Sequence, residues 1–342
     1  MSDARFWHVP PSGGLAAVPT AEEALRRRDA EGGFAWLALK DPSAEDFRPL
    51  EAPLGLHPLS VEDALDENQI PKLDDFPEYA FLLFNAFSYT PERLCVQEVD
   101  FFLGADFLVS VDRTGPDGKP LLAGTEELVA RSMAQDRKGP AYLLHTLLDV
   151  LVDRKFAAIA SLEDELADAE EKVLSREAGF DPRSLQHVRR DLVTLRKVLF
   201  HEREVFVKIT RRDCPFIPED ALFPYRDVYD HLTRFFELTE TLRDVVTSLM
   251  EIDLSLRSNE MARAANRTNR SVRRLTFITT IFMPLSLLAG IGGMSEWTMM
   301  TGAANWRLAY PLFLLAMTAI GLGSYFLLKW MVKRDEQKED DG

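Results

Sequence analysis

The chain has 342 residues, of which 46% are hydrophobic, and it carries a formal charge of −15 at pH 7. This length allows a sizeable soluble core together with membrane segments. The acidic balance suits a protein that meets cations and argues against a nucleic-acid partner, because nucleic-acid binders carry basic patches. The two cysteines, Cys95 and Cys214, lie far apart, which predicts reduced thiols rather than a disulfide or a metal site. Residues 1–29 show no basic-then-apolar leader, so we expect no cleaved signal peptide.

Residues 1–138 predict a cytosolic α/β domain. Helices are expected to begin at Thr20, Ser43 and Ser60, because a hydroxyl oxygen can cap the first turn of a helix. Ser60 is followed by Asp63 at capping-box spacing, although glutamate is the usual residue there. Strands are expected at residues 34–39, 79–89, 94–103 and 107–111. The last three should form an antiparallel meander that is covered by helices.

From Gly139 onward the alternating pattern of strands disappears. Residues 139–214 predict an antiparallel helical hairpin, because apolar residues recur at helical intervals in two stretches, 141–176 and 182–212. Residues 215–274 predict the cytosolic part of a long stalk helix. No proline or glycine interrupts the chain from Tyr225 until Pro284, which predicts one helix of about 60 residues, roughly 90 Å long.

Two apolar runs, residues 275–293 and 308–330, are each close to the ~20 residues that a ~30 Å hydrocarbon layer requires. Residues 294–307 would form the extracytoplasmic loop between them, and 331–342 a charged cytoplasmic tail. Basic residues flank the outer ends of the two runs: Arg263, Arg267, Arg270, Arg273, Arg274, Lys329, Lys333 and Arg334. The positive-inside bias therefore places both termini in the cytoplasm. The predicted fold class is an α+β cytosolic domain with a long helical stalk and two C-terminal transmembrane helices.

The long helix carries, into its apolar run, a stripe of small or weakly polar residues in steps of three and four. Its members are Asn269, Val272, Thr276, Thr279, Met283, Ser286, Gly290 and Gly293. This spacing is typical of a helix packed against parallel copies of itself. A bundle of such helices would line its axis with an amide, hydroxyls, a thioether and exposed backbone. These groups can hold a hydrated cation through its water shell, which suits Mg²⁺ because it dehydrates reluctantly. Val272 and Met283 would form apolar rings that gate by dewetting. Alternatively, the small residues only allow close helix packing in lipid.

At residues 280–291 the chain resembles the first transmembrane helix of the CorA family of divalent-cation channels. Residues 55–65 and 69–73, with Tyr79 and Phe81, resemble the family's N-terminal segment, so the resemblance covers nearly the whole chain. It implies a funnel-shaped homopentamer in the cell (inner) membrane, with a pore lined by the first transmembrane helix. It also implies uptake driven by the membrane potential, usually of Mg²⁺ and sometimes of Co²⁺ or Ni²⁺. We expect no enzyme activity and no cofactor, since no ATP-binding loop or catalytic constellation occurs.

The family ends this helix with Gly-Met-Asn, whereas this chain has Gly293, Met294 and Ser295. The shorter serine predicts a wider outer ring and a weaker ion contact. Glu296 could compensate by attracting cations to the outer mouth, or it is a solvated loop residue.

Together, the periodicity and the resemblance predict this ion pathway: Asn269, Val272, Leu275, Thr279, Met283, Ser286, Gly290, Gly293, Met294 and Ser295. Asn269 and Ser295 would contact the ion through its bound waters, and Leu275 would lie near the apolar gate. Matching the stalk puts Arg234 where the family's cytosolic magnesium sensor has an acid, so we do not expect that site to be preserved. His57 is interpreted as a structural residue rather than a metal ligand.

The sequence thus favours a channel for hydrated divalent cations, chiefly Mg²⁺. Two alternatives stay open. One is a transporter like the ZntB branch, which carries Zn²⁺ together with protons. The other is a non-conducting scaffold that anchors the soluble domain to the membrane.

Overall fold

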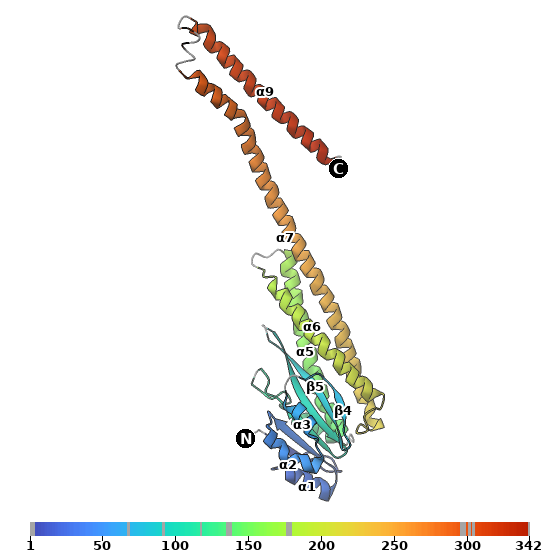
Figure 1. Ribbon diagram of the computed structural model, residues 1–342. Coiled ribbons are helices and arrows are strands. Elements are labelled where there is room, and N and C mark those ends of the chain that lie inside the picture. The colour runs from blue at the N-terminus through green and yellow to red at the C-terminus, as the bar shows by residue number, and fades with distance from the viewer. Residues whose placement is uncertain are drawn as a thin grey trace. The chain divides into compact units, whose positions relative to one another are not determined.

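The computed structural model describes residues 4–66, 69–90, 93–116, 118–134, 139–175, 180–294, 299, 302 and 305–340. The chain forms two compact units, an N-terminal unit of residues 1–253 and a C-terminal unit of residues 254–342. Helix α7 (Leu222–Gly292) contributes to both units. Figure 1 shows the elements of each unit in chain order, from blue to red.

Within the described residues, the N-terminal unit contains one sheet with the order β2-β1-β3-β7-β6-β5-β4. Its strands are β1 (Arg5–Val9), β2 (Ala16–Val18), β3 (Phe34–Lys40), β4 (Leu73–Asp75), β5 (Tyr79–Thr90), β6 (Arg93–Gly104) and β7 (Phe107–Asp112). Strands β3 and β7 are parallel, and the other neighbouring pairs are antiparallel. The predicted meander of β5, β6 and β7 is therefore confirmed, as is the strand at β3.

Helices cover both faces of this sheet. On one face, α1 (Ala21–Glu31), α2 (Ala44–Leu54) and α3 (Pro58–Leu65) bury side chains such as Phe47 against Phe81 and Phe102 of the sheet. Successive strand residues point to opposite faces, so Phe84 points the other way, where its ring contacts Phe206 of α6 (Arg183–Thr210). Helix α5 (Pro140–Ser175) packs against β5 and β6, and α4 (Thr125–Ala134) packs against α5.

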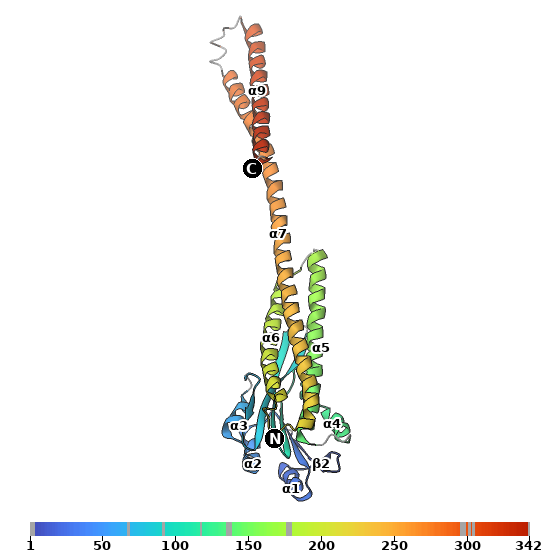
Figure 2. The same ribbon diagram turned by 90° about the vertical axis from the view of Figure 1, so that its right-hand side faces the viewer.

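Three helices of the N-terminal unit run side by side, α5, α6 and the first part of α7, as Figures 1 and 2 show. The two helical stretches predicted at 141–176 and 182–212 are confirmed by α5 and α6. A short 3₁₀ helix, η1 (Glu219–Ala221), precedes α7. The hydroxyl of Tyr225 on α7 donates to the carbonyl oxygen of Ala141 on α5 at 2.7 Å, which ties the start of the long helix to the hairpin.

A fully buried ion pair joins the hairpin to the sheet. The Lys155 ammonium on α5 lies 2.9 Å from the Glu202 carboxylate on α6, and both side chains have no exposed surface. Lys155 also donates to the Asn85 carbonyl of β5 and lies 4.1 Å from the ring centroids of Phe84 and Phe87. Burial lowers the pKa of Lys155 and raises the pKa of Glu202, and the opposite charge of each partner counteracts the shift in the other.

The helix starts predicted at Thr20 and Ser43 are confirmed. The Thr20 hydroxyl oxygen accepts from the Glu23 N–H at 3.2 Å, and Ser43 forms a capping box with Asp46. The strands β1, β2 and β4 and the helix α4 were not predicted. Two of these strands have only three residues, too few to show a period.

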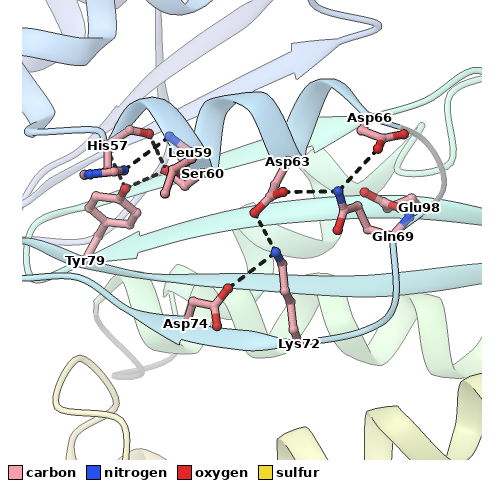
Figure 3. A network of polar contacts seen from close by, with 10 residues as sticks. All are labelled: His57, Leu59, Ser60, Asp63, Asp66, Gln69, Lys72, Asp74, Tyr79 and Glu98. Carbon is pink, nitrogen blue, oxygen red and sulfur yellow. Dashed lines mark hydrogen bonds and ion pairs between the residues drawn. The ribbon is translucent and has the colours of Figure 1, made fainter.

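The start predicted at Ser60 is wrong. Helix α3 begins three residues earlier, with His57 as its N-cap and Pro58 in its first turn. The His57 Nδ1 atom accepts from the Leu59 N–H at 3.2 Å, which takes the role expected of a serine hydroxyl. Proline suits the first helical position because its fixed φ is already helical and it has no N–H to satisfy. The Ser60 hydroxyl instead lies 2.6 Å from the Tyr79 hydroxyl (Figure 3).

The C-terminal unit consists of the end of α7 and helix α9 (Trp306–Asp340). The predicted uninterrupted helix is confirmed, and it continues through Pro284 to Gly292. Both helices include a stretch long and apolar enough to cross a membrane. They run antiparallel, since Gly292 of α7 lies against Phe313 of α9, and Leu285 lies against Gly321.

Candidate functional site

The predicted stripe lies on an open face of α7. All eight of its members are exposed in the chain: Asn269, Val272, Thr276, Thr279, Met283, Ser286, Gly290 and Gly293. Met283 is 70% exposed and Val272 is 56% exposed. Leu275 and Met294, two of the three predicted pathway residues outside the stripe, are exposed as well. Ser295 and Glu296 lie outside the described residues, so their predicted roles stay predictions.

The opposite face of α7 is the one that α9 covers. The partly buried positions from 275 to 294 are Phe277, Ile281, Pro284, Leu285, Leu288 and Gly292. At 100° per residue, these positions centre about 170° around the helix from the stripe. Helix α9 therefore leaves the whole stripe free for another partner, and it packs on the apolar side of α7.

The glycines of α7 divide between these two faces. A Cβ atom added at Gly292 would lie 2.7 Å from the Phe313 ring, so a larger residue here would force this ring of α9 to shift. A Cβ atom at Gly290 would meet nothing within 4 Å, and one at Gly293 would meet only backbone of its own helix. Gly290 and Gly293 thus expose backbone on the stripe, and close packing to α9 does not explain them.

Two hydroxyls of the stripe have a fixed role in hydrogen bonding. Thr276 donates to the Val272 carbonyl at 2.9 Å, and Thr279 donates to the Leu275 carbonyl at 2.9 Å. Such bonds to the preceding turn use the hydroxyl hydrogen. The remaining lone pairs of each oxygen face outward and can only accept. Because the waters around a cation point their hydrogens outward, these oxygens can bind a hydrated cation without touching the metal itself.

The stripe carries no formal charge. No Asp or Glu occurs from Met261 to Met294, and the nearest basic residue, Arg273, lies about 100° around the helix from the centre of the stripe. An ion at this face would keep its hydration, since no carboxylate is present to replace the bound waters of a hard cation such as Mg²⁺. Within the described parts of the chain, no group of three or more His, Cys, Asp or Glu side chains is placed to hold a metal ion.

The N-terminal motif of residues 55–73 builds a polar network over one face of the sheet (Figure 3). The Lys72 ammonium donates to Asp63 at 2.5 Å, and the Gln69 amide donates to the same carboxylate at 3.1 Å. The Gln69 backbone N–H donates to Glu98 of β6 at 3.1 Å. These bonds hold the segment after α3 onto the sheet. The interpretation of His57 as a structural residue agrees with this arrangement, because its side chain caps α3.

Two carboxyl groups are buried beneath this network. Burial raises the pKa of Glu98 to about 6, and it raises the pKa of Asp100 well above its ordinary value, with the neighbouring Glu98 as the second cause. The Arg113 guanidinium lies 4.0 Å from Asp100 and donates to the Ala64 carbonyl of α3. This pair was not predicted. Its signal was the presence of acids at positions 98 and 100 of β6, directly before the apolar residues 101–103.

In this chain an α+β unit precedes two helices that are long and apolar enough to cross a membrane, one of them with a weakly polar open face. Residues 31–334 match the family described as CorA-like Mg²⁺ transporter protein. The chain belongs to this CorA family, whose members are ion transporters and not enzymes. The resemblance noted in the sequence is thus confirmed.

Individual relatives agree with this assignment. The chain is 34% identical over 272 residues to the cobalt/magnesium transport protein CorA of Thermotoga maritima, covering 78% of this chain and 74% of that protein. It is 29% identical over 326 residues to the putative metal ion transporter YfjQ of Bacillus subtilis, covering 94% and 97%. The structure of the CorA magnesium transporter from Methanocaldococcus jannaschii has a similar fold, with a TM-score of 0.66 at 20% identity, covering 95% of this chain and 96% of that one.

Proposed function

We propose that the chain forms a homopentameric, funnel-shaped channel for hydrated divalent cations, chiefly Mg²⁺, in the cell membrane with both termini in the cytoplasm. The observation that carries this proposal is the stripe on α7, which is polar or small, open along its whole length and opposite the face that α9 covers. Copies of the chain that pack around a shared axis would turn this stripe inward and leave α9 on the outside.

The ion would be held weakly and through water. The outward oxygens of Thr276 and Thr279 would accept from the ion's bound waters, and Asn269 would do so at the inner end. Val272 and Met283 would form the apolar rings at which the pore closes. Conduction requires sites that an ion can leave as well as enter, which favours such contacts over carboxylates. The membrane potential supplies ~2.3 kcal/mol per charge per 100 mV, about 4.6 kcal/mol for a divalent ion.

Flux measurements in liposomes test this proposal with a matched pair of variants. Thr279→Val removes the outward oxygen and keeps the shape of the side chain. Thr318→Val makes the same change on α9, where the exposed hydroxyl donates to the Leu314 carbonyl at 2.9 Å in the same way. With a net hydrogen-bond value of ~1 kcal/mol, Thr279→Val should lower Mg²⁺ flux about fivefold, whereas Thr318→Val should leave it unchanged. Equal effects of the two variants would contradict the assignment of the stripe to the pore.

The same assay separates the two other candidates. Movement of Zn²⁺ only when a pH gradient is present would identify a proton-coupled zinc transporter. Liposomes that stay impermeable to Mg²⁺, Zn²⁺, Co²⁺ and Ni²⁺ would indicate a scaffold. Neither result is expected if an uncharged, acceptor-lined axis conducts the hydrated ion.

A further inference from the structure

Four arginines form a row on one face of α7, just before its apolar stretch. Arg263, Arg267, Arg270 and Arg274 follow one another in steps of four, three and four, and each is exposed. No Asp or Glu lies between Met261 and Met294, and the nearest acid before this stretch of α7 is Glu260, three residues before Arg263. We call these four residues the arginine face.

The arginine face points away from the stripe. At 100° per residue its centre lies about 170° around the helix from the centre of the stripe. In the proposed bundle it would therefore lie at the periphery, on the same side as α9, and not in the pore. Its partner is consequently not the transported ion but something that surrounds the bundle.

The heights of these residues along α7 point to the membrane surface as that partner. With a rise of 1.5 Å per residue, Arg274 and Arg270 lie about 2 and 8 Å before Leu275, where the apolar stretch begins. Arg267 lies about 12 Å before it and Arg263 about 18 Å. The headgroup layer on each side of a bilayer is roughly 5–8 Å thick. Arg274 and Arg270 thus lie within this layer.

Helix α9 adds a further positive charge at the same height. The antiparallel contacts of Gly292 with Phe313 and of Leu285 with Gly321 fix the register of the two helices. Continued along both helices, this register brings the exposed Lys329 close to the start of the apolar stretch of α7. Residues 329–336 of α9 contain Lys329, Lys333 and Arg334 against Asp335 and Glu336, so three positive and two negative charges leave this stretch with a net charge of +1. Two helices therefore present cations to one layer.

We propose that the arginine face, with Lys329, is a docking surface for the headgroups of anionic phospholipids. A guanidinium binds a phosphate by two parallel hydrogen bonds as well as by charge. A basic residue near an anionic surface contributes about 1 kcal/mol, which is about fivefold in affinity, and the attraction decays over a Debye length of ~8 Å at physiological salt. The contribution should therefore decline from Arg274 to Arg263. The inference rests on the proposed function for the insertion of α7 in the membrane and for the bundle that turns the arginine face outward.

Lipid titrations of the full-length protein in non-ionic micelles test this inference. The probes are dansyl-labelled phosphatidylglycerol and phosphatidylcholine with identical acyl chains, and the readout is energy transfer from tryptophan, with Trp330 close to the proposed site along α9. The wild type should prefer phosphatidylglycerol. Arg274→Gln and Arg270→Gln should each weaken its binding about fivefold, Arg274→Lys should retain most of it, and Arg263→Gln should change it less than twofold. Arg234→Gln, an exposed position on α7 about 60 Å before Leu275, is the matched control and should have no effect.

Three results would overturn the inference: equal binding of the two lipids by the wild type, an effect of Arg263→Gln as large as that of Arg274→Gln, or loss of the signal when soluble glycerophosphate is added at the lipid's concentration. The last result would identify a site for a free phosphate instead of a membrane surface. The melting temperature of each variant is also measured, and lipid binding is compared only among variants that melt at the wild-type temperature, so that misfolded variants are excluded. Because no ion flux is measured, failure here leaves the proposed channel untouched, and failure of the channel leaves this test intact.

Discussion

Replacing Lys155 by methionine should destabilise the N-terminal unit by about 3–5 kcal/mol at pH 7, the usual cost of removing one partner of a buried ion pair. Methionine keeps most of the side chain's volume, so the lost ammonium is the main change. Its removal leaves the Glu202 carboxylate buried, and among the described residues the Asn85 backbone N–H at 3.0 Å is its one remaining hydrogen-bond donor.

The size of this cost follows from the proton that Glu202 would take up. A buried carboxylate without a partner becomes protonated, because the neutral form avoids the cost of desolvating the charge. At pH 7 this protonation costs 2.303RT for each pH unit between 7 and the ordinary pKa of 4.5. The 2.5 units amount to about 3.4 kcal/mol, and the lost contacts of the ammonium with the carbonyl and the two rings add about 1 kcal/mol.

This reasoning gives the variant a distinctive pH dependence. In the variant the folded state holds a proton on Glu202 that the unfolded state has released, so the folded state binds more protons and its stability rises as the pH falls toward 4.5. Between pH 7 and pH 5 the variant should regain about 2.7 kcal/mol relative to Lys155→Met/Glu202→Gln, which lacks the titrating group. The double variant should itself recover most of the loss.

Urea unfolding of the full-length protein in detergent, followed by intrinsic fluorescence at pH 7 and pH 5, measures these differences. Lys172→Met removes an exposed lysine from the same helix and is the control, with an expected change below about 0.5 kcal/mol. A cost of Lys155→Met below about 1 kcal/mol at pH 7, or a cost that is the same at both pH values, would refute the argument.

The remaining predictions concern the two helix faces, the buried carboxyls and the outer mouth. Gly292→Ala should lower the melting temperature of the C-terminal unit, because its Cβ would lie 2.7 Å from an aromatic ring of α9, whereas Gly290→Ala should not; equal effects would contradict the assignment of the faces. Because the pKa of Glu98 rises to about 6 on folding, from an ordinary 4.5, the folded state binds the extra proton and stability should fall by up to about 2 kcal/mol as the pH rises from 4.5 to 6. Glu98→Gln should flatten this dependence of stability on pH, measured by urea unfolding. An unchanged dependence would show that another group causes it. Ser295→Asn should strengthen Mg²⁺ uptake or its block by hexa-ammine cobalt, a mimic of the hydrated ion, and a variant unchanged in both would show that Ser295 does not touch the permeant species.

Much of this architecture follows from periodicity and chain breaks. Strands β5, β6 and β7 are long runs bounded by turn residues, and α5, α6 and α7 repeat apolar residues over many turns, so local pattern alone defines them. The start of α3 was misplaced because a histidine ring nitrogen can cap a helix as a hydroxyl does, and Pro58 after it was the better signal. The three-residue strands β2 and β4 exist because a neighbouring strand pairs with them, which no local pattern records.

The buried ion pair shows what a sequence does and does not contain. Lys155 lies four residues after Leu151 and four before Ile159, and Glu202 lies three after Leu199 and four before Phe206, so both charges stand at core positions of their helices. That phase is visible in the sequence and predicts burial. Their pairing is not visible, since it depends on how far α6 is shifted along α5. The sequence likewise does not show that Gly292 contacts α9 and Gly290 does not, because this difference depends on the register of α9.

The placement of charge around α7 bears on which ions could use the proposed pore. A hydrated cation turns the hydrogens of its waters outward, whereas a hydrated anion turns water oxygens outward and needs donors. Thr276 and Thr279 have already given their hydrogens to the helix, so this part of the lining accepts and favours cations without a fixed charge. An arginine on the same face would undo this preference, because two like unit charges 4 Å apart repel by about 4 kcal/mol at an effective dielectric constant of 20. The arginine face lies about 170° away, so the charges that suit a membrane surface are kept out of the path of the ion.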